Sequence, residues 1–156
     1  MLELNYGEVL RMCNVMSVAK AVCEACNWSL TNLKLQKMMY ILQMVYMGNH
    51  KGERLFDATF EAWDYGPVIP ELYHELKMFG SKNIKDVFWY ASPITDGDKR
   101  SYIERNAPIL CRLSGAQLVS LTHQPNTAWY KHYAPGARGI QIPDTDIMDE
   151  YKQYWN

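Results

Sequence analysis

Residues 31–48 read TNLKLQKMMYILQMVYMG, and this stretch decides the fold. Thr31 offers an N-cap oxygen, Leu33 to Met47 have helical spacing, and Gly48 stands near the expected end. The apolar residues form two nearly opposite stripes, one of Leu35, Met38, Met39, Leu42, Val45 and Tyr46, the other of Leu33, Tyr40, Met44 and Met47. A helix that is apolar on two sides is usually enclosed on both. The pattern therefore predicts a helix at the centre of the fold.

Three polar residues interrupt this helix. Gln36 and Gln43 lie together in a gap between the two stripes, and Lys37 lies within the second stripe. A buried ammonium group is costly, so Lys37 must either extend to water or find a carboxylate. Glu61 and Asp64 are the carboxylates we would expect to serve it.

The segments around the central helix alternate apolar runs with breakers. Before it, Val9 to Asn27 has the spacing of an amphipathic helix. After it, a strand is expected over Phe56 to Trp63, ended by Tyr65-Gly66-Pro67. A helix should begin near Pro70, continue over Glu71 to Phe79 and end at Gly80.

The second half of the chain also favours helices. Residues 84–91 are either strand or irregular, and a helix is expected from Lys99 up to Pro108. The remaining expectations are a helix over Ser114 to Leu121 with Leu118 and Leu121 inward, a segment over 125–139 that is mostly loop, and a last helix over Thr145 to Tyr154 capped by Asp144. Together these segments predict a mainly helical α+β fold, with a central buried helix and a small antiparallel sheet, in a single domain over residues 1–156.

The composition excludes several classes of protein. Of 156 residues, 48% are hydrophobic and 21% charged, which is typical of a globular protein. The formal net charge of −1 makes nucleic acid an unlikely main partner, because phosphate-binding proteins usually show a basic excess. The sequence holds no apolar run of about 20 residues and no signal peptide, so neither membrane insertion nor export is expected. Its four unevenly spaced cysteines fit reduced thiols in the cytoplasm.

Few residues suggest chemistry. Cys23 and Cys26 form a CxxC pair, but a zinc site would need two more ligands, so we interpret the pair as core packing. Cys111 and His123 could act as nucleophile and base in a hydrolase, yet no known catalytic motif accompanies them. No metal or cofactor is expected. Residues 125–139 contain several glycines and prolines, so their side chains should lie at the surface. Four ring side chains in this segment could anchor a protein interface, namely Trp129, Tyr130, His132 and Tyr133.

Three sequence blocks resemble a known family. They are LTNLKLQKMMY at 30–40, FEAWDYGPVIPELY at 60–73, and LVSLTH at 118–123 followed by Trp129. Their order and spacing are similar to those of the Panacea family, also called the SocA-like antitoxin or phage-associated protein family. The resemblance covers roughly Ser17 to Trp155. The matching signature residues, which serve as scaffold or bind the partner, are Lys34, Lys37, Tyr40, Glu61, Trp63, Tyr65, Gly66, Pro67, Tyr73, Thr122, His123 and Trp129.

The resemblance implies a binding protein and not an enzyme. Members of this family are thought to neutralise toxins by direct binding, and some act as adaptors that deliver the toxin to a protease. A DNA-binding module often accompanies the domain; we expect none in this chain, and therefore no autoregulation by DNA binding. One alternative is a phage or prophage protein that binds a host factor without a cognate toxin. A lesser alternative is the Cys/His hydrolase that uses Cys111 or His123.

Overall fold

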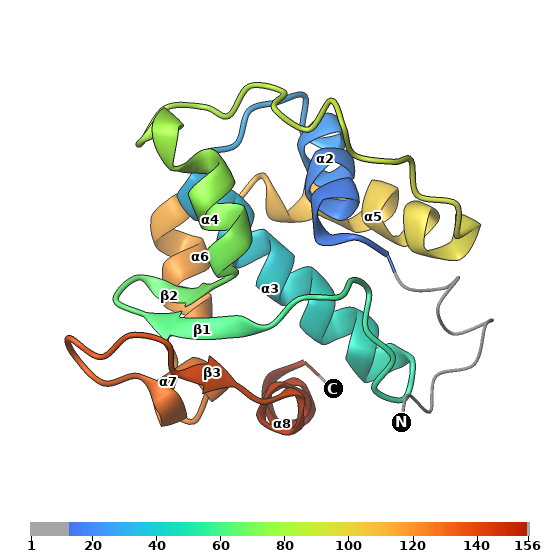
Figure 1. The fold of residues 1–156 in the computed structure, drawn as a ribbon. Helices are drawn as coiled ribbons and strands as arrows, with labels where there is room; N and C mark the ends of the chain where they lie inside the picture. Colours follow the sequence, from blue (N-terminus) through green and yellow to red (C-terminus); the bar gives the residue numbers. More distant parts are fainter. Residues whose placement is uncertain (1–12, 156) are drawn as a thin grey trace, which may run out of the picture.

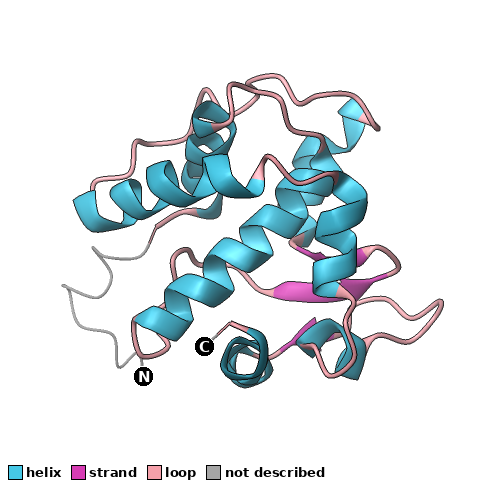
Figure 2. Cartoon of the chain, turned by 180° about the vertical axis from the view of Figure 1, so that it is seen from behind, coloured by secondary structure: helices cyan, strands magenta, loops and turns pink. Residues whose placement is uncertain are grey.

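The computed structural model describes residues 13–155 as a layered arrangement of helices around a small sheet (Figures 1 and 2). One long helix, α3, runs diagonally through the middle, with α2 and α5 on one side and the sheet, α7 and α8 on the other. The helices are α2 (Val15–Ala25), α3 (Asn32–Asn49), α4 (Pro70–Leu76), α5 (Gly97–Leu110), α6 (Gly115–Thr122), α7 (Ala128–His132) and α8 (Asp144–Tyr154), with a 3-10 helix η1 (Lys77–Phe79) after α4. The strands are β1 (Phe60–Trp63), β2 (Gly66–Val68) and β3 (Gln141–Ile142). The predicted mainly helical α+β class is confirmed.

Helix α3 is the buried centre that its two apolar stripes predict. Thr31 caps it, since Thr31 Oγ1 accepts a hydrogen bond of 3.2 Å from the Lys34 amide. Most side chains of both stripes are fully buried, because α2, α4, α5, α6, α8 and β2 surround the helix. Gly48 lies inside the helix, one residue before its end. A Cβ at Gly48 would lie 2.4 Å from the ring of Tyr151, so this glycine allows α8 to pack closely against α3.

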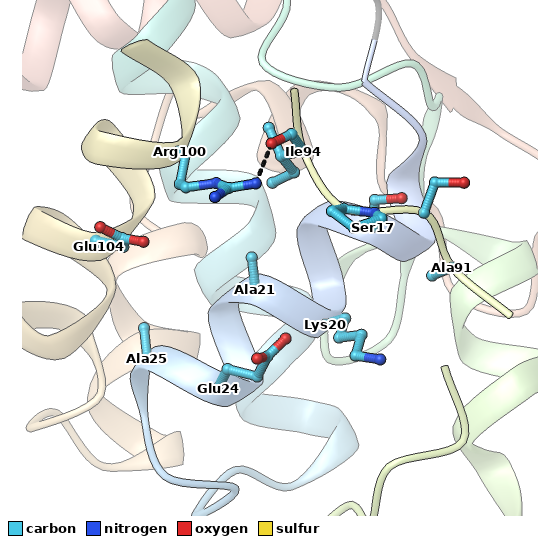
Figure 3. Close-up of a pocket in the computed structure, with 11 residues that line it drawn as sticks. Ser17, Lys20, Ala21, Glu24, Ala25, Ala91, Ile94, Arg100 and Glu104 are labelled. Carbon is cyan, nitrogen blue, oxygen red and sulfur yellow. Dashed lines mark hydrogen bonds between the residues drawn. The ribbon is translucent and has the colours of Figure 1, made fainter. Parts of the chain in front are cut away.

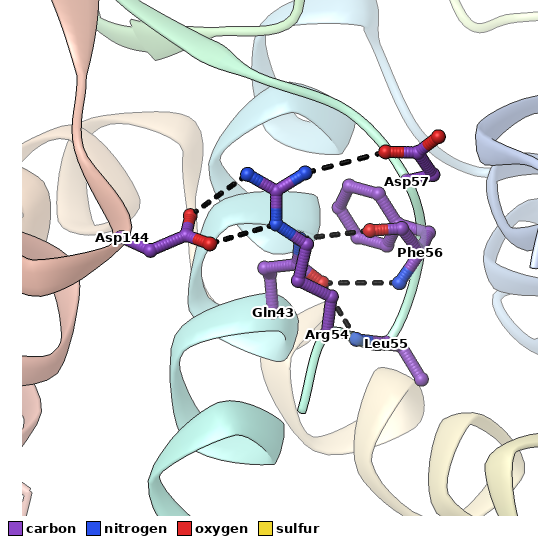
Figure 4. A network of polar contacts seen from close by, with 6 residues as sticks. All are labelled: Gln43, Arg54, Leu55, Phe56, Asp57 and Asp144. Atoms are coloured by element: carbon purple, nitrogen blue, oxygen red, sulfur yellow. Dashed lines mark hydrogen bonds and ion pairs between the residues drawn. The ribbon is translucent and has the colours of Figure 1, made fainter. Parts of the chain in front are cut away.

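The two buried glutamines of α3 bind main-chain atoms of the segments that flank the hairpin. Gln43 Oε1 accepts hydrogen bonds from the amides of Leu55 (2.9 Å) and Phe56 (3.1 Å), and its Nε2 donates to the Phe56 carbonyl at 3.0 Å (Figure 4). Gln36 Oε1 accepts from the Ile69 amide at 2.9 Å. We call these two side chains the glutamine clamps. They hold the chain that enters β1 and the chain that leaves β2 against the central helix.

The antiparallel sheet has the order β2-β1-β3. The predicted strand over residues 56–63 is shorter than expected and begins only at Phe60. The strand ends at Trp63, before Tyr65-Gly66-Pro67, as expected, but Gly66 and Pro67 also begin β2, which forms a hairpin with β1. Proline fits here because β2 lies at the edge of the sheet, where a missing N–H breaks no ladder.

The helices before and after the hairpin follow the predicted order with shifted ends. Of the helix predicted over Val9 to Asn27, the structure has Val15–Ala25, and residues 9–12 lie outside the described part. Helix α4 and the 3-10 turn cover the segment predicted between Pro70 and Gly80. Residues 85–91 are irregular. Helix α5 continues through Pro108 to Leu110, which corrects the predicted stop.

Two further expectations for the C-terminal part were wrong, those for Leu121 and Asp144. Leu121 is 39% exposed, because α6 turns only Leu118 and Thr122 inward. Residues 125–139 are mostly loop, as expected, and are interrupted by the five residues of α7. Asp144 is the first residue of α8 and not its cap, because its carboxylate binds Arg54 through bonds of 2.8 and 3.1 Å (Figure 4). No helix within residues 13–155 is long and apolar enough to cross a membrane.

Candidate functional site

Lys37 lies at the centre of the cluster formed by the signature residues. Its side chain is 0% exposed, and its Nζ donates a 3.0 Å hydrogen bond to the Pro67 carbonyl. Within residues 13–155, no carboxylate lies within ion-pair distance of this ammonium, so the expected pairing with Glu61 or Asp64 was wrong. Lys37 instead binds the free edge of β2, where a carbonyl has no strand partner. Burial lowers the pKa of Lys37 to about 7.

The two expected carboxylates have other partners. Glu61 Oε1 accepts a 3.0 Å hydrogen bond from the indole Nε1 of Trp63, on the same strand. Asp64 Oδ1 accepts a 2.5 Å hydrogen bond from the Tyr133 hydroxyl. Glu61 therefore orients Trp63 within β1, Asp64 connects the hairpin turn to Tyr133 after α7, and neither is the partner of Lys37.

Gly66 brings β2 close to Lys37 and to the end of α6. Its φ is +111°, a conformation that residues with a Cβ rarely adopt. A Cβ here would lie 2.8 Å from Lys37 Cε, 3.0 Å from His123 Nε2 and 3.1 Å from Thr122 Oγ1. Four signature residues, distant in sequence, thus meet at one point that only glycine can occupy.

An aromatic stack covers this point on the side of α7. The ring of His123 stacks on Trp129 at 3.7 Å, and Trp129 stacks on Tyr133 at 4.5 Å. The Trp129 indole also donates a 2.7 Å hydrogen bond to the Trp63 carbonyl. Trp129 is only 8% exposed, so the expectation that it is surface-presented was wrong, whereas Tyr130 is exposed. The short helix α7 turns Trp129 inward onto the hairpin.

His123 ends α6 with one ring nitrogen unsatisfied. Its Nε2 is buried and has no hydrogen-bond partner among the described residues. Burial, together with the charge of Lys37, lowers the pKa of His123, which favours a neutral imidazole. Thr122 beside it donates to carbonyls of its own helix, at Leu118 (3.3 Å) and Val119 (3.0 Å), as expected for a helix end.

Two further signature residues act as scaffold. Tyr40 is fully buried and donates a 2.7 Å hydrogen bond to Glu150 of α8, which also accepts from the Ala128 amide at 2.9 Å. Burial raises the pKa of Glu150, and these two hydrogen bonds oppose that rise. Lys34 Nζ donates to the Cys111 carbonyl at 2.9 Å and ties α3 to the end of α5. Both residues hold helices together; Tyr40 is buried, whereas Lys34 is partly exposed.

A groove opens beside the hairpin, and we call it the hairpin groove. Its volume is about 540 Å³, and its lining includes Leu33 and Lys37 of α3, Trp63 and Tyr65 of the hairpin, Tyr73 of α4, and Arg138 of the loop after α7. Trp63 and Tyr73 meet edge to face at 4.9 Å, while Tyr65 is 70% exposed at the hairpin tip. Four signature residues thus border the groove. Sequence reasoning missed Arg138, because nothing in its loop marks it, and assigned Leu33 wholly to the core.

A second cavity, of about 560 Å³, lies between α2, α5 and residues 91–94 (Figure 3). Ala21 and Ala25 line it together with two acidic side chains, Glu24 and Glu104, and two basic ones, Lys20 and Arg100. The Arg100 guanidinium donates to the Ile94 carbonyl and closes one end. The charges around this cavity balance, and no signature residue borders it.

The cysteines are placed for packing. Cys23 and Cys26 are both buried, and burial raises the pKa of each thiol to about 12, so neither supplies a reactive thiolate at neutral pH. Cys111 lies near Cys26 at the end of α5, while His123 stacks on Trp129 at the end of α6. The described residues show no contact between Cys111 and His123. They also contain no group of three His, Cys, Asp or Glu side chains arranged to hold a metal ion.

Comparison with known proteins gives a consistent result. The family model described as "Antitoxin SocA-like, Panacea domain" matches residues 35–130. The chain is also similar to the protein "Antitoxin SocA" of Caulobacter vibrioides (strain NA1000 / CB15N), with 32% identity over 137 residues, covering 79% of this chain and 72% of the relative. No solved structure matches. The matched region contains the hairpin, the Lys37–Gly66–His123 cluster and most of the hairpin groove, and the chain therefore belongs to the SocA-like antitoxin family with its Panacea domain.

Proposed function

We propose that this chain acts as a single antitoxin domain, which neutralises a protein toxin by binding it directly in the cytoplasm. The observation that carries the proposal is the family match over residues 35–130, together with the likeness to a protein named as an antitoxin. The structure is compatible with a binding role, because its distinctive residues build a rigid hairpin and a groove. Direct binding requires only a surface of suitable shape and charge.

Growth rescue is the first test of the proposal. Each gene found beside that of this chain is expressed from an inducible promoter in a bacterial host, with and without this chain. We expect one product to arrest growth and the chain to restore it. The purified pair should then elute together in size-exclusion chromatography. Absence of both rescue and complex for every neighbouring product would refute the toxin proposal and favour the binding of a host factor.

A second arm separates simple binding from delivery to a protease. The half-life of the toxin is followed after translation is stopped, with and without the chain. A shorter half-life in the presence of the chain supports the adaptor role, and an unchanged half-life with full rescue supports neutralisation by binding alone.

The hydrolase alternative is tested in the same assay. Cys111 is partly buried at the end of α5. Lys34 binds its backbone carbonyl, which an alanine would keep. A Cys111→Ala variant should therefore rescue growth as well as the wild type. Loss of rescue by a variant that still folds and still binds the toxin would favour a reaction that uses this thiol.

A further inference from the structure

We infer that the toxin binds in the hairpin groove. The segment of the toxin that occupies the groove is acidic and carries an aromatic or aliphatic side chain. The inference rests on the proposed function, because it names where and by what chemistry the toxin binds. Three properties of the groove support it: its walls, its charge and its rigidity.

The walls of the groove offer apolar and aromatic surface. Tyr65 extends from the hairpin tip with 70% of its surface exposed, and Leu33 is 39% exposed at the start of α3. Trp63 and Tyr73 form the edge-to-face pair that continues this surface. Rings of Trp and Tyr are the side chains that most often dominate protein interfaces. The groove therefore suits a partner that inserts one apolar side chain.

The groove carries one exposed positive charge. It belongs to Arg138, in the loop after α7, which has no ion pair among residues 13–155. Lys37 also lines the groove, but it is fully buried, and its pKa of about 7 leaves it only partly protonated at neutral pH. The one acidic side chain in the lining, Asp64, already accepts a hydrogen bond from Tyr133. Complementary charge steers association and sets specificity. A carboxylate beside the inserted side chain would pair with Arg138.

The floor of the groove is fixed before any partner arrives. The Lys37 amine donates to the Pro67 carbonyl and Gln36 accepts from the Ile69 amide, so the middle of β2 and the residue that follows it are bound to α3. The stack of His123 and Trp129 supports the hairpin from the other side. A preformed site loses little conformational entropy on binding, which favours affinity. By contrast, the α2–α5 cavity has balanced charges and gives no preference for the sign of a partner.

The test compares groove variants with matched variants elsewhere. The probe is the toxin that the wild-type chain neutralises in the growth assay, and its Kd is measured by isothermal titration calorimetry. We expect Tyr65→Ala and Arg138→Glu each to weaken binding by about tenfold or more. Trp89→Ala removes a ring that is 82% exposed outside the groove, and Arg105→Glu reverses an exposed charge on α5, so both should stay within about twofold of the wild type.

A reversal of charge tests the acidic partner directly. Toxin variants that bind the Arg138→Glu chain are selected from a random library. The inference predicts that they carry Lys or Arg in place of Asp or Glu. Arg138→Lys, which keeps the charge, should retain most of the affinity.

The outcomes separate the two proposals. If the wild type binds no toxin, the proposed function itself fails. If the wild type binds but the groove variants bind equally well, or only Trp89→Ala weakens binding, the groove is not the surface and only this inference is overturned. Circular dichroism and thermal unfolding show that each variant remains folded.

Discussion

Replacing Lys37 with Met should make the protein more stable at neutral pH, although it removes a hydrogen bond. Lys37 is fully buried and has one carbonyl partner, and burial lowers its pKa from 10.5 to about 7. The folded state therefore binds a proton at this amine less strongly than the unfolded state does. Between about pH 7 and 10.5 the unfolded chain holds more protons, so the free energy of unfolding rises with pH across this range.

The size of the effect follows from the pKa shift. At pH 7 the burial of Lys37 costs about 4 kcal/mol. The lost bond to the Pro67 carbonyl offsets about 1–3 kcal/mol of this. We therefore expect Lys37→Met to raise the free energy of unfolding by about 1–3 kcal/mol at pH 7. We also expect the wild type to gain about 1–2 kcal/mol between pH 7 and 8.5, a gain that the variant lacks.

The assay is urea unfolding followed by circular dichroism at several pH values from 7 to 8.5. Lys34→Met is the matched control, because Lys34 lies one turn earlier on α3, also donates to a carbonyl and is only partly buried. The free energy of unfolding of Lys34→Met should depend on pH in the same way as that of the wild type. The reasoning is refuted if Lys37→Met is less stable than the wild type at pH 7 and the two proteins share the same pH dependence.

Three further changes test other parts of the structure. Gly66→Ala should lose about 3 kcal/mol or more of stability, because its φ is +111° and three side chains lie within 3.1 Å of the added Cβ; an unchanged urea midpoint would contradict this. Gln43→Leu should lose about 2–5 kcal/mol, since it leaves buried main-chain groups unpaired, whereas the exposed Gln124→Leu should change stability little in the same titration. Cys23 and Cys26 should resist iodoacetamide at pH 8 in the native protein and react after unfolding, as followed by mass spectrometry, because burial raises the pKa of both thiols to about 12.

The central helix could be predicted because its signals are local. Thr31 at the cap and two long apolar stripes specify α3 without reference to any other segment. The strand at Gly66 and Pro67 could not be predicted in the same way. It has three residues, and it is held by Lys37 and Gln36, which lie some thirty residues earlier in the chain. A glycine and a proline next to each other indicate a turn, and the contacts with α3 hold the chain after that turn as the second strand of a hairpin.

The structure brings many of the signature residues together, but their contacts could not be predicted. Lys37 stands in an apolar stripe, which predicts either an extension to water or a carboxylate partner, because a backbone carbonyl carries no sequence signal. Glu61 and Asp64, the expected partners, bind Trp63 and Tyr133 instead. The Trp129 segment contains breakers, and the burial of Trp129 depends on a five-residue helix too short for a periodic pattern.

The glutamine clamps have a consequence for the motions of the native state. The amide hydrogens of Leu55, Phe56 and Ile69 lie outside helices and strands, in segments where fast exchange with solvent would be the usual expectation. Each is bound by a buried glutamine of α3, and all three residues are almost fully buried. Their deuterium uptake should therefore be as slow as that of the middle of α3, so the connections around the hairpin open only when the whole protein unfolds.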